Sequence, residues 1–212
     1  FATTGFDRIL KDDSKWDVFN TLLYWPVDRP AAVNIAQPST RDGQISSAGL
    51  RAEMKRALAN DTHPDGPDYW KVEALAAIPG NILLFGIREV GDSYKQFNYS
   101  TRILALPYTL DENCFHTTGP MEEVFSFKTH DVPESVAISG LEYAAETQTL
   151  WLLTSFESGD RPEDIGGYLW SLPIQGLPLQ GNPKLLRLND GKPLKFTHKS
   201  EGVTPIDNHH LL

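Results

Sequence analysis

The stretch Lys71–Glu89, KVEALAAIPGNILLFGIRE, decides the fold that the sequence predicts. It contains two apolar runs, Val72–Ile78 and Ile82–Ile87, and the Pro-Gly-Asn between them is typical of a tight turn. The second run ends directly in the charged residues Arg88 and Glu89. We therefore predict a β-hairpin. Because an isolated hairpin is marginally stable in water, we expect it to belong to a larger sheet.

The outline of this hairpin returns twice further along the chain. Ile138–Glu157 again contains an apolar strand, a polar turn and a second apolar strand, and Lys199–Leu212 begins the pattern a third time. The aligned starts at positions 73, 139 and 201 are 66 and 62 residues apart. Nearly equal periods indicate a repeat architecture, and each period has room for about four strands, the content of one propeller blade.

Most of the remaining chain also favours strands. Runs typical of strands occur at residues 16–25, 101–108, 121–128 and 168–173. The polar stretch Gly91–Tyr99 predicts a loop. The only helix that we predict is Gly49–Asn60, where Leu50, Met54, Ala57 and Leu58 recur at helical spacing.

These elements predict an all-β, β-propeller-like protein with about three to four blades and one inserted helix. We treat residues 1–212 as one domain and residues 26–67, rich in Pro and Gly, as a loop and helix insertion. Phe1 and Leu212 both fall inside expected strands, so we expect a ring truncated at both ends. Its two open strand edges would then be covered by a protein partner or by a missing part of the same chain.

Composition excludes several classes of protein. The chain has 212 residues, 19 Lys and Arg against 28 Asp and Glu, and a net charge of −9, which disfavours nucleic acid as a partner. No apolar run approaches the length of a membrane span, so we expect a soluble protein. With Cys114 as the single cysteine, no intrachain disulfide can form, which fits the cytoplasm and also a periplasm.

The strand starts and ends together resemble a known family. The residues concerned are FAT at 1–3, EAL at 73–75, LLFGIRE at 83–89, ISGLEY at 138–143, LWLL at 150–153 and EGV at 201–203. They look like an uncharacterised bacterial β-propeller family, a domain of unknown function that is similar in pattern to the esterase-like propellers associated with phytases. The resemblance covers most of the chain outside residues 26–67 and implies a propeller fold, but it is poorly specific for any chemistry.

Charged residues at the starts and ends of propeller strands converge on the central channel. On this basis the candidate ligand-binding residues are Glu73, Arg88, Glu89, Glu142, Glu157, Lys199 and Glu201. Carboxylates around a channel could hold a hard cation such as Ca²⁺, with Glu73, Glu142 and Glu201 as the ligands, or act as acid and base. Arg88 and Lys199 could instead hold an anion. In a structural interpretation these groups pair with one another and cap the strand ends.

Other chemical signals in the sequence are weak. His209 and His210 are adjacent, so in a strand they would point to opposite faces, and we expect no joint metal site there. Cys114 has no base near it in the sequence and is expected to be an inert thiol. The sequence contains no P-loop, G-x-S-x-G, H-E-x-x-H or EF-hand motif.

Two functions remain open from the sequence. The first is a non-enzymatic propeller scaffold or binding module that takes a protein partner, which the acidic composition, the inserted helix and the missing catalytic motifs favour. The alternative is a metal-assisted esterase or phosphoesterase that uses the channel carboxylates. Three carboxylates facing one ion would favour the hydrolase, whereas a channel closed by Arg and Glu pairs would count against it.

Overall fold

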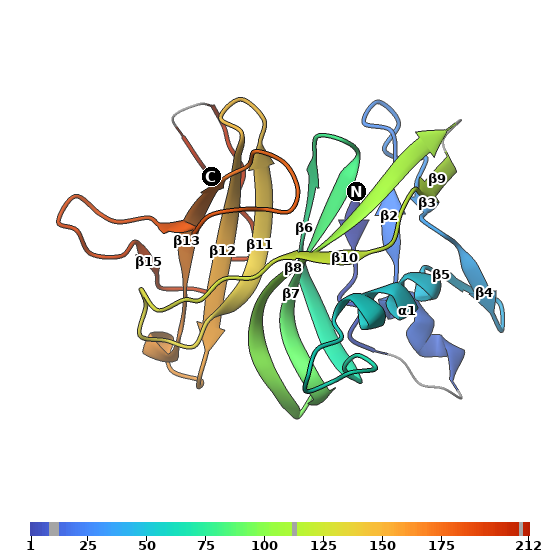
Figure 1. The fold of residues 1–212 in the computed structure, drawn as a ribbon, viewed down its shortest axis with the longest axis horizontal. Coiled ribbons are helices and arrows are strands. Elements are labelled where there is room, and N and C mark those ends of the chain that lie inside the picture. Colours follow the sequence, from blue (N-terminus) through green and yellow to red (C-terminus); the bar gives the residue numbers. More distant parts are fainter. Residues whose placement is uncertain (9–12, 112–113, 208–209) are drawn as a thin grey trace.

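The chain is described by a computed structural model that covers residues 1–8, 13–111, 114–207 and 210–212. These residues are mostly strands, with one α-helix and two 3-10 helices. Three sheets lie side by side across the molecule, and a two-stranded sheet lies at one end (Figure 1). Within the described ranges none of the sheets closes on itself. The prediction of an all-β protein is confirmed.

The central sheet grows from the predicted hairpin. Its strands are β6 (Tyr69–Ile78), β7 (Ile82–Ser93), β8 (Gln96–Asp111) and β10 (Glu122–Phe125), in the antiparallel order β10-β8-β7-β6, with β9 (Cys114–Thr117) paired to β8. The turn between β6 and β7 uses positive φ angles at Gly80 and Asn81, which these residue types tolerate.

The predicted loop Gly91–Tyr99 was wrong. β7 and β8 continue through this polar stretch and turn only at Tyr94 and Lys95. The polar residues fit a strand because this end of the hairpin is largely exposed. Gly91 permits the pairing, since a Cβ there would lie 2.3 Å from the carbonyl oxygen of Gln96.

The C-terminal sheet has the same winding as the central sheet. Its strands are β11 (Ala137–Ala144), β12 (Thr149–Glu157), β13 (Ile165–Pro173) and β14 (Lys184–Leu185) in that order, with β15 (Lys195–Phe196) also paired to β13. The short 3-10 helix η2 (Pro162–Asp164) joins β12 to β13. In both sheets the first strand contains a bulge at the aligned position, Glu73 in β6 and Ser139 in β11.

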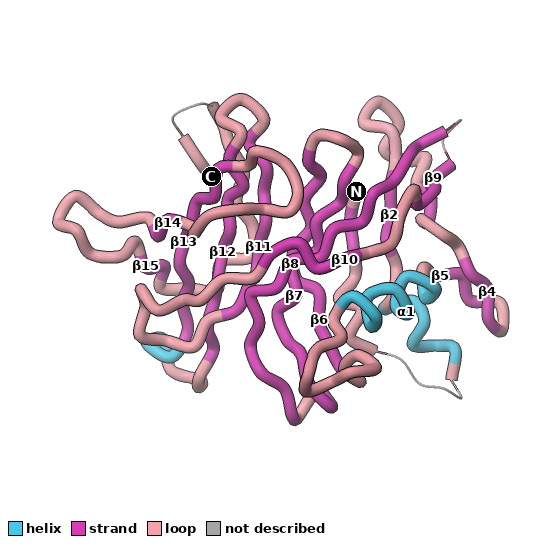
Figure 2. Tube along the Cα trace, in the orientation of Figure 1, coloured by secondary structure: helices cyan, strands magenta, loops and turns pink. Residues whose placement is uncertain are grey.

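The third copy of the pattern does not form a hairpin of long strands. Figure 2 shows that the chain beyond β13 is mostly loop. In Lys199–Leu212 the described residues make an isolated bridge between Pro205 and Leu211, supported by two backbone hydrogen bonds between Thr204 and Leu212. The apolar residues of this segment line a groove beside β12 and β13, and they do not extend the sheet in the described part of the segment.

The N-terminal part contributes the third sheet. It consists of β1 (Ala2–Thr3), β2 (Leu22–Tyr24) and β3 (Asn34–Ile35), and β4 (Ser39–Arg41) and β5 (Gln44–Ser46) form the separate hairpin. The predicted extended run 16–25 was wrong in its first half, where the 3-10 helix η1 (Ser14–Phe19) forms. Asp13 caps this helix by accepting a hydrogen bond from the backbone N–H of Lys15.

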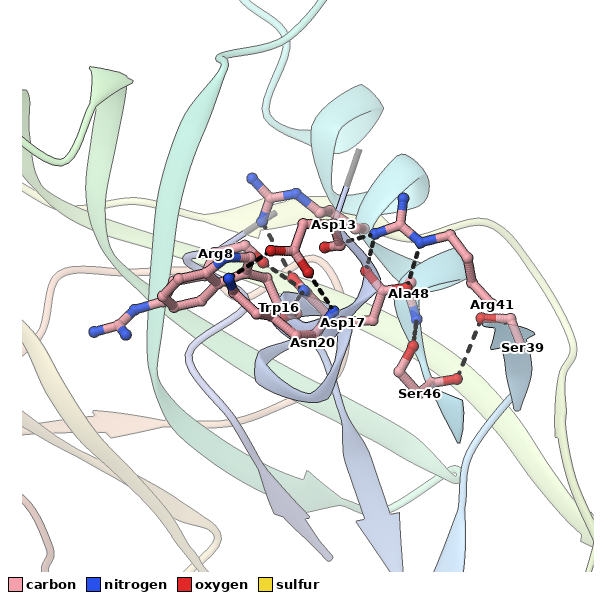
Figure 3. Close-up of polar contacts among 11 residues, drawn as sticks. Arg8, Asp13, Trp16, Asp17, Asn20, Ser39, Arg41, Ser46 and Ala48 are labelled. Carbon is pink, nitrogen blue, oxygen red and sulfur yellow. Dashed lines mark hydrogen bonds and ion pairs between the residues drawn. The ribbon is translucent and has the colours of Figure 1, made fainter. Parts of the chain in front are cut away.

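A polar cluster ties η1 to the β4–β5 hairpin (Figure 3). The guanidinium of Arg41 donates to both carboxylate oxygens of Asp17, over 2.6 and 2.9 Å. The side-chain amide of Asn20 donates to the carbonyl oxygens of Arg8 and Trp16. These bonds satisfy polar groups at the end of the short helix, so we assign the cluster a structural role.

Two apolar cores separate the sheets. One lies between the central and C-terminal sheets and contains Leu84, Ile138, Leu152 and Trp170. The other lies between the central sheet and the N-terminal part, where Leu50 and Met54 of helix α1 (Ala48–Ala57) are fully buried. The predicted helix is therefore confirmed, and residues 26–67 supply part of a core.

The central and C-terminal sheets pack closely at Gly86 of β7. A Cβ at this position would lie 2.6 Å from a methyl carbon of Ile138 and 2.7 Å from Cβ of Ala74. Because both neighbours are packed in the core, Gly86→Ala should lower the free energy of unfolding by about 1–3 kcal/mol, measured by urea denaturation. Gly49→Ala is the control, because its Cβ meets nothing within 4 Å in a helix. Equal stability of the two variants would contradict this packing.

Candidate functional site

Five of the seven predicted site residues meet at one place, together with Lys71. We call this group the charged junction; it consists of Lys71, Glu73, Arg88, Glu89, Lys199 and Glu201. β6 supplies Lys71 and Glu73, β7 supplies Arg88 and Glu89, and the segment after β15 supplies the other two. Three cations and three carboxylates are thus brought together from segments more than 100 residues apart in the sequence.

Arg88 is the centre of the charged junction. Its side chain is 2% exposed, and its Nε lies 3.2 Å from Glu73 and 3.7 Å from Glu89. Its Nη1 donates to Oγ of Ser155 in β12 over 2.6 Å, and its guanidinium lies 5.0 Å from the ring centroid of Tyr99. A buried guanidinium needs such partners, because an unpaired charge in the interior is costly.

The bulge in β6 aims Glu73 at the other charges. One carboxylate oxygen lies 2.6 Å from Nζ of Lys71, and the other lies 3.2 Å from Arg88 and 3.5 Å from Lys199. Lys199 also pairs with Glu201 over 2.9 Å. The bulge is the feature that allows one carboxylate to touch three cations, because a bulged residue is released from the regular alternation of the strand.

The pKa shifts agree with mutual neutralisation. Burial alone lowers the pKa of Lys71, but its hydrogen bond to Glu73 and the surrounding carboxylates raise the pKa overall. The hydrogen bond from Lys199 lowers the pKa of Glu201. Burial and the hydrogen bond that Tyr69 donates to Glu89 raise the pKa of the Tyr69 hydroxyl. For both Lys71 and Glu201, the neighbour of opposite sign favours the ionised form.

The other two predicted residues lie apart from these ion pairs. Glu157 ends β12 with its side chain exposed, and only its backbone carbonyl is used, as the acceptor for the Tyr99 hydroxyl. Glu142 is half-buried on β11. In the described part of the chain, no three His, Cys, Asp or Glu side chains group closely enough to hold a metal ion, so Glu73, Glu142 and Glu201 do not form the suggested Ca²⁺ site.

A groove on the C-terminal sheet was not predicted. The face of this sheet turned away from the central sheet borders a groove of about 790 Å³, together with residues from 186–207 and 210–212. Most of its lining is apolar and includes Trp151, Leu153, Leu169, Leu194, Phe196 and Leu211. The signal in the sequence was the second apolar stripe of β12, since Leu150 and Leu152 face the core and Trp151 and Leu153 face the groove.

Glu142 lies beside this groove. It is paired directly across the strands with Trp151, and residues opposite each other in an antiparallel pair share one face. Burial raises the pKa of its carboxyl. The sequence therefore identified Glu142 as a candidate binding residue, but the structure places it at the groove and not among the ion pairs.

Cys114 and His209 were the other residues considered in the sequence analysis. Cys114 is an exposed free thiol, and His209 lies outside the described residues. The helices of the described ranges include none with the length and apolar character of a membrane span. No protein-family model matches the chain, and no curated protein matches it either.

Replacing Arg88 tests whether the charged junction is structural. Arg88→Met keeps the volume approximately but leaves Glu73 and Glu89 without their shared buried cation, so it should cost about 3–5 kcal/mol of unfolding free energy. Arg161→Met is the matched control: Arg161 pairs with Asp164 but is 70% exposed, and should cost about 1 kcal/mol or less. Chemical denaturation measures both, and similar losses would contradict a structural role for the buried charge.

The opposite pKa shifts of Glu142 and Glu201 predict opposite pH effects. The raised pKa of Glu142 means that its ionisation costs stability as the pH rises above the ordinary glutamate value, so Glu142→Gln should raise Tm at pH 7.5. The lowered pKa of Glu201 means that its charge stabilises the fold above that value, so Glu201→Gln should lower Tm at pH 7.5. Both differences should shrink toward pH 3.5 in thermal melts. A shift of the same sign for both variants would refute the assignment.

Proposed function

We propose that the chain is a non-enzymatic, β-propeller-like binding module that takes a protein partner in the groove on the C-terminal sheet. Two five-stranded sheets, each with four strands in the same winding order, are stacked with an apolar core between them, and this supports the propeller-like arrangement. The aligned bulges at Glu73 and Ser139 support its origin in a repeated unit. We also propose that the chain is related to the bacterial propeller family that its sequence resembles.

The groove is the observation that carries the proposal. Its volume of about 790 Å³ and its mainly apolar lining are properties of binding sites, which usually combine an apolar wall with a few polar groups. It lies on an outer sheet face, so a partner reaches it without separating two sheets. A protein segment with apolar side chains would fill it and cover Trp151, which is half-buried in the free chain.

The hydrolase alternative has no comparable support. It needs carboxylates that converge on an ion or on a substrate, whereas Glu73, Glu89 and Glu201 each lie against Arg88 or Lys199. A substrate would have to break these ion pairs before it met a reactive group. The charged junction is better explained as the closed joint between the strands that carry it.

Partner capture tests the proposed function. The immobilised chain should retain one or more proteins from a bacterial extract, and Leu194→Gln should release them because it places an amide in the apolar lining. Leu188→Gln is the control, since Leu188 is 50% exposed and lies outside the lining. Mass spectrometry of the eluates gives the readout. Capture that is equal in the three samples, or no capture by the original chain, would overturn the proposal.

A further inference from the structure

We infer that the partner segment in the groove is basic as well as apolar: a short stretch of a protein chain in which Leu, Val or Phe side chains are flanked by Lys or Arg. This inference rests on the proposed function and adds the chemistry of the partner. Three features of the groove carry it, namely its apolar lining, the sign of the charge in that lining and its opening to solvent.

The wall of the groove can accept several apolar side chains. Leu153 and Leu169 form its floor and are buried, whereas Trp151, Leu194 and Phe196 are half-buried around them. Covering these side chains removes apolar surface from water, which is the main favourable term in association. Because the floor is already buried, an occupant would remove apolar surface from water mainly at the half-buried rim.

The carboxylates in the lining of the groove favour a positively charged partner. Among the described residues that line it, the ionisable side chains are Glu146, Asp207 and His210, and none is Lys or Arg. Glu142 adds a third carboxylate beside Trp151. The whole chain carries a net charge of −9, so the long-range field also attracts a cation. Complementary charge of this kind selects partners and speeds their association.

The raised pKa of Glu142 is consistent with a cationic occupant. A carboxyl whose burial disfavours ionisation gains from a nearby positive charge, because the cation stabilises the ionised form. His210 already lies 2.8 Å from Asp207 through Nδ1. Among the described residues no cation pairs with Glu142 or Glu146, so we expect these two to be the main partners of the incoming Lys or Arg.

The shape of the groove favours a chain segment over a small molecule. Small-molecule sites usually enclose most of the ligand surface, whereas this groove is partly open to solvent. A peptide segment needs such an opening, because the partner chain must enter and leave. The volume of about 790 Å³ limits the occupant to a short stretch with a few apolar side chains.

Three fluorescein-labelled peptides test the inference. Each has the core Leu-Val-Leu-Phe, flanked on both sides by two Lys, two Ser or two Glu, and fluorescence polarisation at pH 7.5 and low salt measures binding. We expect the Lys peptide to bind about tenfold more tightly than the Glu peptide, with the Ser peptide between them. Leu194→Gln should weaken all three. Equal affinities, or no binding of the Lys peptide, would overturn the inference.

Two sets of variants locate the charge effect. The triple variant Glu142→Gln, Glu146→Gln and Asp207→Asn should reduce the preference for the Lys peptide to about threefold or less, since only the net charge of the chain then favours it. Glu163→Gln, at the other end of β12, should leave the preference unchanged. A preference that survives the triple variant would refute the assignment to the groove. If the groove captures a protein but shows no charge preference, only this inference fails and the proposed function stands.

Discussion

The buried guanidinium of Arg88 is the interaction on which the arrangement of the strands depends. It lies in the central sheet but also reaches Ser155 in the C-terminal sheet, and its carboxylate partner Glu73 contacts Lys199. A charge that is 2% exposed must keep these partners, because water cannot replace them. The ion pairs and the hydrogen bond to Ser155 therefore fix how β6, β7, β12 and the segment after β15 meet.

The paired charges and the apolar sheet faces differ in how accessible they are to a ligand. The charges at the strand ends neutralise one another and leave little for a substrate, while the apolar faces of the sheets differ in how completely they are covered. Both faces of the central sheet lie in apolar cores. In the described part of the chain, the outer face of the C-terminal sheet borders a groove that residues from 186–207 and 210–212 help to line. Function is therefore expected where the packing is incomplete.

The sequence predicted the fold class and the central hairpin because both depend on local patterns. Apolar runs such as Val72–Ile78 and the turn at Gly80 identify their own structure. The secondary structure was predicted wrongly where it depends on tertiary contacts and not on the local sequence. Lys199–Leu212 resembles a strand start in sequence, but its described apolar residues line a groove beside β12 and β13. The 3-10 helix η1 replaces a predicted strand where Asp13 caps a helical turn.

The candidate site was predicted in part for the same reason. Strand-end charges can be listed from the sequence, and five of the seven do meet through ion pairs. Their pairing could not be predicted, because it depends on the bulge at Glu73 and on the path of the chain after β15. The groove was missed because its lining combines β12, β13 and a distant segment.

Amide hydrogen exchange with and without the Lys peptide tests the central claim most directly. If the groove is the binding surface and the charged junction is a closed structural joint, protection should increase in residues 149–157 and 194–196 and stay constant at Lys71, Glu73 and Arg88. Increased protection confined to the charged junction, or no change in either region, would contradict this account.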